Sequence, residues 1–302
     1  MNASDLQSAL QGPQPPVLIN VLPPECHDAR HIAGSHNACV YEVAFTGNVQ
    51  SLVPEKDRRI VVYGAGGDSL DAGTAVEKLK AAGYTDVEAF SGSLDDLEKA
   101  GLKLEGTGSF PASPTLDGLY HVNPDASVIR WTGRNLFNFH HGTVKLSGGT
   151  IELADGRLVS ACFTVDLRTI VCDDIADAAM NAMLIRHLRD PDFFEIDQHP
   201  TAEFAVQSAE KIDPCTDGTP NYQIHGHATV RGVTQPLDFP ALIASADAQS
   251  LTAQAQFEVD RTRFGSHYGS GRFFRFLGKH VVNDCFHLHL KIQAEPIKTT
   301  LR

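Results

Sequence analysis

The chain has 302 residues, of which 42% are hydrophobic and 21% charged, and its formal net charge at pH 7 is −12. This composition is ordinary for a globular protein and excludes a wholly disordered or collagen-like chain. At roughly 150 residues per domain the length predicts two domains, although one large barrel would also fit. The acidic balance argues against a nucleic-acid partner, since such proteins usually carry a basic face.

The sequence has no feature of export or membrane insertion. No stretch approaches the roughly 20 apolar residues of a transmembrane helix. Residues 1–16 have neither the basic start nor the apolar core of a signal peptide. Scattered cysteines without a C-x-x-C pair are typical of reduced, mostly buried thiols, and we therefore expect a cytoplasmic protein. The six cysteines are Cys26, Cys39, Cys162, Cys172, Cys215 and Cys285.

Residues 1–106 have the pattern of apolar strands alternating with helices. A glycine-rich turn separates the second strand from a long helix, with Asp68 or Ser69 as the N-cap and Gly83 at the end. Strands buried on both faces, each followed by a helix, predict a parallel α/β sheet. In chain order we expect strands at residues 17–22, 60–63 and 87–90, and helices at about 70–82 and 94–100.

Several short motifs of this first domain occur in the same order and spacing as the motifs of a known family. They are Leu18-Ile-Asn-Val21, Arg30-His-Ile-Ala-Gly-Ser35, Val61-Val-Tyr-Gly-Ala-Gly-Gly67, Ala81-Ala-Gly-Tyr84 and Phe90-Ser-Gly-Ser93. In these segments the domain resembles the rhodanese domain. The family's sulfur-carrying cysteine begins the loop between strand and helix and acts as a thiolate activated by the loop amides. In this chain Gly64 stands at that position, and Ser69 stands at the position of the loop arginine.

The resemblance therefore implies a rhodanese-like fold without its nucleophile. Without the thiol there is no persulfide, and a phosphate-binding P-loop is excluded because no Lys-Ser or Lys-Thr follows the glycines. We expect a catalytically inactive accessory module for docking, sensing or the formation of a homodimer. The alternative is a sulfurtransferase that uses Cys26 or Cys39 as a non-standard thiol. The degenerate loop consists of Gly64, Ala65, Gly66, Gly67, Asp68 and Ser69.

The sequence pattern changes near residue 106. A stretch rich in Gly, Ser and Pro predicts a linker at residues 107–117, between domains at 1–106 and 118–297. In the second domain apolar and polar residues alternate, as in strands with one dry and one wet face. Together with one helix at 177–188, this predicts an antiparallel barrel or sandwich. The alternating segments are residues 159–167, 202–206, 223–230, 251–259 and 286–292.

The dry face of these strands combines large and small side chains, and the alternation also assigns Val159 to it. An eight-stranded barrel has room either for packed side chains or for one ligand. The pattern alone leaves a solid core and a cavity equally open. The large residues are Phe163, Val165, Phe204, Val206, Phe257 and Val259, and the small ones are Ala161, Ala202, Gly226, Ala228, Ala253 and Ala255.

Three histidine pairs are candidates for a metal site: His140-His141, His225-x-His227 and His287-x-His289. Residues two apart in a strand point to the same face, so the last two pairs could each grip a metal ion. That face is exposed to solvent, and no carboxylate or cysteine lies at a matching position on it to complete a metal site. Solvated histidines are therefore favoured, and we expect no metal. A histidine-coordinated metal protein is an alternative. A catalytic triad lacks a supporting motif such as G-x-S-x-G.

A second series of segments spans nearly all of residues 119–296. It includes Tyr120-His-Val-Asn-Pro-Asp125, Val128-Ile-Arg-Trp-Thr-Gly133, His141-Gly-Thr-Val-Lys-Leu146, Pro200-Thr-Ala-Glu-Phe204 and Asp260-Arg-Thr-Arg-Phe-Gly265. In these segments the domain resembles the YceI-like family. The resemblance implies a lipocalin-like antiparallel barrel whose interior holds a polyisoprenoid chain, such as that of an isoprenoid quinone.

The two resemblances together imply a non-enzymatic lipid-binding protein that stores or transports a prenyl lipid. Specificity would come from the length of the tail and from polar groups at the mouth of the barrel, for which Arg189, Asp190 and Arg272 are candidates. The predicted ligand-binding residues are Trp131, Ala161, Phe163, Val165, Phe193, Phe194, Phe204, Val206, Gly226, Ala228, Ala255, Phe257, Phe273, Phe274 and Leu288.

Overall fold

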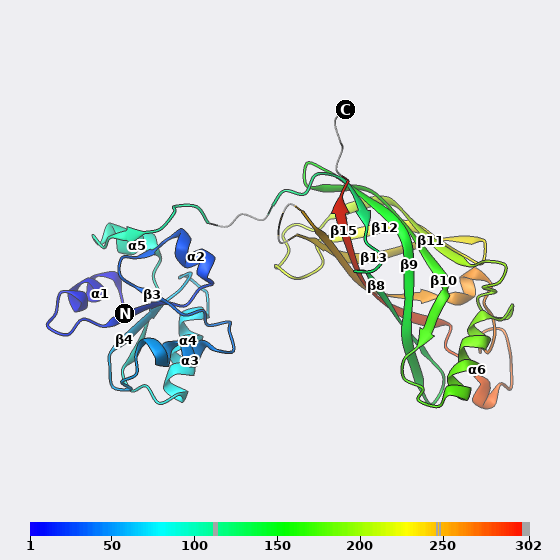
Figure 1. Cartoon of the computed structure of the whole chain (residues 1–302), viewed down its shortest axis with the longest axis horizontal. Helices are drawn as coiled ribbons and strands as arrows, with labels where there is room; N and C mark the ends of the chain where they lie inside the picture. The colour runs from blue at the N-terminus through cyan, green and yellow to red at the C-terminus, as the bar shows by residue number, and fades with distance from the viewer. Residues whose placement is uncertain (111–113, 246, 248, 298–302) are drawn as a thin grey trace. The chain divides into compact units, whose positions relative to one another are not determined.

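The computed structural model describes residues 1–110, 114–245, 247 and 249–297. The chain divides into two compact units, Met1–Ala112 and Ser113–Arg302 (Figure 1). Part of the predicted linker, residues 111–113, lies outside the described residues.

The first unit is built on a four-stranded sheet in the order β3-β1-β4-β5, in which all neighbouring strands are parallel. This confirms the predicted rhodanese-like α/β architecture. A separate two-stranded sheet joins β2 to β6. The elements are α1 (Ala3–Leu10), β1 (Val17–Asn20), α2 (Pro24–Ala29), β2 (His31–Ile32), β3 (His36–Asn37), α3 (Phe45–Leu52), β4 (Ile60–Tyr63), α4 (Asp71–Ala81), β5 (Val87–Phe90), α5 (Leu94–Lys99) and β6 (Leu104–Glu105).

The central strand β4 is buried because its side chains point alternately into two hydrophobic clusters. Ile60 and Val62 pack with residues of α3 and α4, whereas Val61 and Tyr63 pack with residues of α1 and α5. All four side chains are at most 1% exposed. Burial on both faces is the reason why this strand reads as a continuous apolar run.

Helix α4 begins later than the sequence predicts. Its N-cap is Leu70, which makes no side-chain capping bond, so the prediction of Asp68 or Ser69 as the cap is wrong. Gly66 and Gly67 have positive φ angles of 77° and 60°. These left-handed residues lengthen the turn after β4, and the two predicted caps remain in the loop.

The second unit is a closed antiparallel barrel. Its nine strands occupy eight positions, because β7 and β8 share one position between β15 and β9, and pairing of β10 with β9 closes the ring. This confirms the predicted lipocalin-like barrel and rules out the open sandwich. The elements are β7 (Gly118–Val122), β8 (Val128–Arg134), β9 (Phe139–Ala154), β10 (Arg157–Cys172), α6 (Ala178–Arg189), β11 (Thr201–Lys211), β12 (Tyr222–Val230), β13 (Val233–Ala244), β14 (Leu251–Asp260), η1 (Arg261–Phe264), η2 (Gly278–His280) and β15 (Cys285–Pro296).

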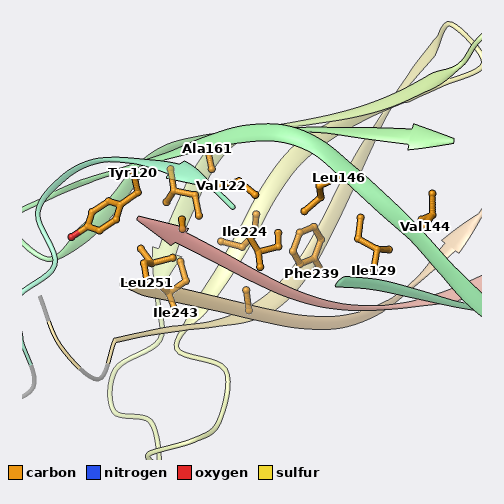
Figure 2. Close-up of a cluster of buried hydrophobic side chains, with 14 of the residues drawn as sticks. Tyr120, Val122, Ile129, Val144, Leu146, Ala161, Ile224, Phe239, Ile243 and Leu251 are labelled. Carbon is orange, nitrogen blue, oxygen red and sulfur yellow. The ribbon is translucent and has the colours of Figure 1, made fainter. Parts of the chain in front are cut away.

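One end of the barrel is filled by hydrophobic side chains (Figure 2). Tyr120, Val122 and Leu251 are at most 3% exposed and belong to one buried cluster. At the same end, the hydroxyl of Tyr222 donates to the carbonyl of Gly156 at 3.0 Å, which ties β12 to the β9–β10 hairpin. Packing therefore closes this end of the barrel.

A bulge in β10 corrects the assignment of Val159. The pairing of β9 with β10 shifts register between Leu158 and Ser160. The extra residue reverses the alternation locally, so Leu158 is buried whereas Val159 is 52% exposed. The prediction that Val159 lies on the dry face is therefore wrong.

Helix α6 begins and ends within one residue of the predicted range 177–188. The carboxylate of Asp177 caps it by accepting the N–H of Met180 at 2.8 Å. Among the described helices, none has the length and apolar character needed to cross a bilayer.

Candidate binding cavity

The interior of the barrel contains a cavity of about 230 Å³ whose wall is almost entirely apolar. It reaches from Ile243, beside the packed end, to Arg134 and Asn283 at the other end. On β15 alone the lining positions run from Cys285 to Ile292, which is about 23 Å of strand at 3.3 Å per residue. The cavity is therefore elongated along the barrel. The cavity is partly open to solvent, and the exposed Arg134 and Asn283 line the end that is not packed.

Twelve of the fifteen predicted ligand-binding residues line this cavity. The period-two pattern predicts nine of them, because lumen-facing side chains recur at every second strand position. Trp131, Phe193 and Phe194 lie outside the alternating segments. All twelve come from six strands of the barrel and from the segment that follows α6. The twelve are Trp131, Ala161, Phe163, Val165, Phe193, Phe194, Phe204, Val206, Ala228, Ala255, Phe257 and Leu288.

The other three predicted residues are not part of the wall. A Cβ at Gly226 would overlap the ring of Phe204, so Gly226 makes room for a lining side chain rather than lining the cavity itself. Phe273 and Phe274 lie in the loop between η1 and η2, where they are 50% and 49% exposed. A loop has no strand period, and their apolar character therefore did not indicate an inward direction.

The predicted mouth residues Arg189, Asp190 and Arg272 also lie outside the cavity wall. Arg189 pairs with Asp197 at 3.5 Å, and Arg272 pairs with Asp260 at 3.2 Å. These side chains satisfy one another at the surface, and their assignment to the mouth of the cavity stays a prediction.

Most of the residues that line the cavity are not among the fifteen predicted ones. Many of them are lumen-facing positions on β8, β9 and β13, whose alternation was not recognised. Phe239 of β13 stacks on Phe257 with ring centroids 4.1 Å apart, and Phe204 lies 5.3 Å from it on the other side. These rings form an aromatic section of the wall and leave the cavity open beside them. Further lining residues of the same strands are Ile129, Val144, Leu146, Ile151 and Leu237.

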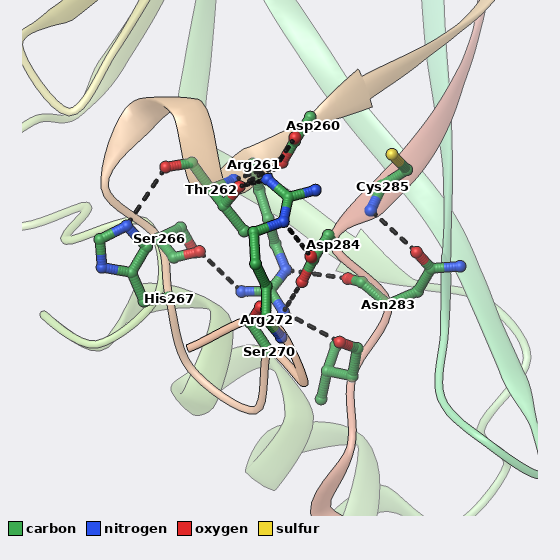
Figure 3. Close-up of polar contacts among 11 residues, drawn as sticks. Asp260, Arg261, Thr262, Ser266, His267, Ser270, Arg272, Asn283, Asp284 and Cys285 are labelled. Atoms are coloured by element: carbon green, nitrogen blue, oxygen red, sulfur yellow. Dashed lines mark hydrogen bonds and ion pairs between the residues drawn. The ribbon is translucent and has the colours of Figure 1, made fainter. Parts of the chain in front are cut away.

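The missed residue with the strongest chemical consequence is Arg261, which lines the cavity and is only 1% exposed (Figure 3). Its guanidinium group donates to the backbone carbonyls of Ser266 at 2.8 Å, Asn283 at 3.0 Å and Val282 at 3.2 Å. The same group lies 5.0 Å from the ring centroid of Phe193. A single buried cation thus holds the turn after β14 against the segment that enters β15.

Carboxylates behind the wall compensate the charge of Arg261. Asp284 lies 4.0 Å from its guanidinium group and also pairs with Arg272 at 3.4 Å. Burial lowers the pKa of Arg261, and the charges of Asp284 and Asp260 oppose that effect. Burial raises the pKa of Asp260, but hydrogen bonds from Thr262 and Arg272 outweigh it and lower the pKa overall.

Two of the histidine pairs lie on the outer face of the barrel. His225 faces Asp238 across β12 and β13 at 3.3 Å, and His287 faces Glu258 across β14 and β15 at 3.4 Å. Contacts between polar side chains at such cross-strand positions support the sheet. Within the described part of the chain, no group of three or more His, Cys, Asp or Glu side chains is arranged as a metal site.

The third pair, His140-His141, contacts Asp174 just before α6. The Asp174 carboxylate lies 2.8 Å from Nδ1 of His140, accepts the N–H of His141 at 2.8 Å, and accepts the thiol of Cys172 at 3.3 Å. Partial burial raises the pKa of Asp174, but these hydrogen bonds outweigh burial and lower the pKa from 3.8 to about 2. The ionised carboxylate therefore ties the start of β9 to the end of β10.

Replacing Asp174 with asparagine is expected to destabilise the barrel by about 1 kcal/mol at neutral pH, a value reduced by solvent screening of this partly exposed site. Because the folded-state pKa is depressed, the contribution is complete above the unfolded-state pKa near 4 and is lost as the pH falls through about 2. Urea unfolding of both proteins should show the difference shrinking between about pH 4 and pH 2. A difference that does not change with pH would contradict this assignment.

In the first unit, a side chain of α4 occupies the glycine loop that follows β4. The carboxylate of Asp71, which is 4% exposed, accepts the N–H of Ala65 at 2.9 Å, the hydroxyl of Ser69 at 2.8 Å and the N–H of Ala72 at 2.6 Å. A Cβ at Gly64 would overlap this carboxylate. An internal anion therefore fills the space beside the first loop position.

The first unit also contains two free thiols, Cys26 and Cys39. Burial, followed by the charge of Glu25, raises the pKa of Cys26. Cys39 is buried, with 6% exposure. A raised pKa leaves less thiolate at neutral pH, so Cys26 is a weaker nucleophile than an ordinary exposed cysteine.

Comparison with known protein families assigns one domain to each unit. The family model of the YceI-like domain matches residues 120–294, and that of the rhodanese-like domain matches residues 2–100. No curated protein gives a significant match to the chain.

Three solved structures align with part of the chain. BcnA of Burkholderia cenocepacia aligns over 57% of this chain and 98% of its own, with 18% identity and a TM-score of 0.45. A polyisoprenoid binding domain from Saccharophagus degradans, implicated in plant cell wall breakdown, aligns over 59% and 98%, with 14% identity and a TM-score of 0.44. The Alr3790 protein from Anabaena sp. aligns over 35% and 81%, with 29% identity and a TM-score of 0.31.

Proposed function

Since this chain belongs to the YceI-like family, whose model matches more than half of it, we propose that its barrel binds, stores or transports a lipid with a prenyl tail, such as an isoprenoid quinone. The observation that carries the proposal is the elongated apolar cavity, which is closed by packing at one end and partly open to solvent. The first unit acts in this proposal as an accessory or docking module.

The volume and chemistry of the cavity suit a hydrocarbon tail. At about 230 Å³ it is larger than an engineered apolar cavity of about 150 Å³ in another protein that binds benzene. Each buried carbon of a tail contributes about 0.8 kcal/mol. Two or three isoprene units would therefore offset ordinary association costs.

Polar groups at the open end favour a head group with hydrogen-bond acceptors. Arg134, Arg261 and Asn283 all line the cavity there. A guanidinium group has five N–H donors, and backbone carbonyls take three of those of Arg261. A quinone carbonyl beside Arg261, with the tail running past the twelve lining residues named above, fits this arrangement.

Organic extraction of the purified full-length protein, followed by mass spectrometry, tests the proposal. We expect a co-purifying prenyl lipid or, from lipid-free protein, stoichiometric uptake of an offered prenyl quinone. Neither a bound lipid nor uptake would contradict it.

We propose that the rhodanese-like unit does not transfer sulfur. Three features support this: glycine at position 64, where the family resemblance predicts the nucleophile, the Asp71 carboxylate inside the loop, and the raised pKa of Cys26. An assay for thiocyanate formation from thiosulfate and cyanide should find no activity. Activity that is lost in Cys26→Ser/Cys39→Ser would instead establish the alternative, a sulfurtransferase with a non-standard thiol.

Because the Asp71 carboxylate lies beside Gly64, substitutions at these two positions should have strongly non-additive effects on the free energy of unfolding. Gly64→Ala is expected to destabilise the first unit by about 2 kcal/mol, because its Cβ displaces a hydrogen-bonded carboxylate. In an Asp71→Ala background the same substitution should cost much less, and urea unfolding followed by circular dichroism measures both. Gly73→Ala on α4 is the control, since open space surrounds Gly73 and alanine there favours the helix. Equal effects of Gly64→Ala in the two backgrounds would argue against the contact.

A further inference from the structure

Six apolar side chains are exposed around the open end of the cavity. They lie at the turn between β8 and β9 and in the loop between η1 and η2. Phe276 is fully exposed, and Phe137 is 76% exposed. We call this set the aromatic rim; it consists of Leu136, Phe137, Phe139, Phe273, Phe274 and Phe276.

The two segments of the aromatic rim meet at the cavity mouth. Asn135 forms an antiparallel bridge with Val282, and the N–H of Asn283 donates to the carbonyl of Arg134 at 2.9 Å. Arg134, Val282 and Asn283 are themselves lining residues of the cavity. Both segments lie at the same end of the barrel as α6 (Figure 1). The aromatic rim therefore borders the opening.

The backbone of Phe276 supports a role for this exposure. Its φ angle is 62°, in the left-handed region that bulky residues rarely adopt. Such a conformation costs free energy, and strained residues cluster at functional sites. The ring of Phe276 is fully exposed, so burial within the chain does not compensate the cost of this conformation.

The two segments and the residues that flank them are basic although the whole chain is acidic. Residues 134–140 and 261–283 contain six Arg or Lys residues and no Asp or Glu, in a chain of net charge −12. Arg261 is buried, and Arg272 pairs with two carboxylates. The other four are exposed and form no ion pair with any residue that the structure describes; they are Arg134, Arg263, Arg275 and Lys279.

We propose that the aromatic rim is a docking surface for an anionic lipid bilayer. Exposed aromatic side chains next to unpaired cations are the combination that binds at the interface of such a bilayer. An anionic surface repels the acidic remainder of the chain, and this repulsion orients the cavity mouth toward the lipid. The inference goes beyond lipid binding in the barrel, because docking does not depend on which lipid the cavity holds.

Co-sedimentation of the full-length protein with vesicles tests the proposal. We expect binding to vesicles of phosphatidylcholine and phosphatidylglycerol in a two-to-one ratio, and little binding to phosphatidylcholine alone. Arg263→Ser/Arg275→Ser/Lys279→Ser should weaken binding about 100-fold, since each cation near an anionic surface contributes about fivefold. Phe273→Ser/Phe274→Ser/Phe276→Ser should weaken it at least about 10-fold.

Matched variants at the packed end of the barrel serve as controls. Leu119→Ser/Val159→Ser removes exposed apolar side chains there, and Arg157→Ser/Lys211→Ser removes exposed cations; both should bind as the parent does. Unchanged circular dichroism shows that each variant folds. Equal binding to both vesicle types, or equal loss in rim and control variants, would overturn the proposal. So would self-association through the aromatic rim without vesicle binding, as measured by sedimentation velocity.

Discussion

Replacing Ala255 with phenylalanine is expected to weaken the binding of a prenyl quinone by roughly 100-fold or more. Ala255 lies on β14, lines the cavity, and is only partly buried although it faces the barrel interior. The space in front of it is the space that a tail would fill. A phenyl ring placed there excludes about one isoprene unit, whose five carbons are worth about 4 kcal/mol. Partial rearrangement of the tail would recover part of this loss.

The native tryptophan provides the measurement. Trp131 is the single tryptophan of the chain, lines the cavity, and is held by a hydrogen bond from its Nε1 to the carbonyl of Val171 at 3.1 Å. A bound quinone should quench its fluorescence, so titration gives the affinity of each variant without a label.

Gln256→Phe is the matched control for Ala255→Phe. Gln256 is the next residue on β14, is exposed, and does not line the cavity. The substitution adds the same ring to the outer face of the same strand and should leave the affinity for the prenyl quinone unchanged. Equal affinities for the parent and Ala255→Phe would place the ligand outside the cavity and contradict the proposed function.

The barrel and many of the residues that line it were predictable because strand geometry is periodic. Each lumen-facing residue such as Phe163 or Val165 repeats the position of its neighbour two places away, so burial can be read from the sequence alone. The same rule failed at Val159, where a bulge inserts one residue into the pairing. It failed again at Phe273 and Phe274, since a loop has no period to indicate direction.

In the glycine loop of the first unit and around Arg261 in the barrel, the sequence predicts which residues are present but not which contacts they make. Glycine at position 64, where the rhodanese resemblance predicts the nucleophile, can be read from the sequence itself. The contact of Asp71 with the loop is not visible there, because it depends on α4 beginning one or two residues later than the sequence predicts. Arg261 belongs to a recognisable motif, Asp260-Arg-Thr-Arg-Phe-Gly265, yet its burial depends on carbonyl groups about 20 residues further along the chain.

Arg261→Met is expected to destabilise the barrel by about 3–5 kcal/mol. Methionine has a comparable length but no donors, so the carbonyls of Ser266, Val282 and Asn283 would lose their partner. Buried acceptors without partners are costly. Asp284, whose Oδ1 is buried without a hydrogen bond, would also lose the guanidinium group that lies 4.0 Å from it.

Arg272→Met separates this effect from a general loss of positive charge. Arg272 pairs with the same carboxylate, Asp284, but its side chain is 55% exposed, and exposed ion pairs contribute about 1 kcal/mol or less. Urea unfolding followed by Trp131 fluorescence reports on the barrel alone, since the first unit contains no tryptophan. If both variants were destabilised equally, the backbone carbonyls around Arg261 would have to find other donors, such as water entering from the cavity. The mouth would then be a hydrated site rather than one closed around a single guanidinium group.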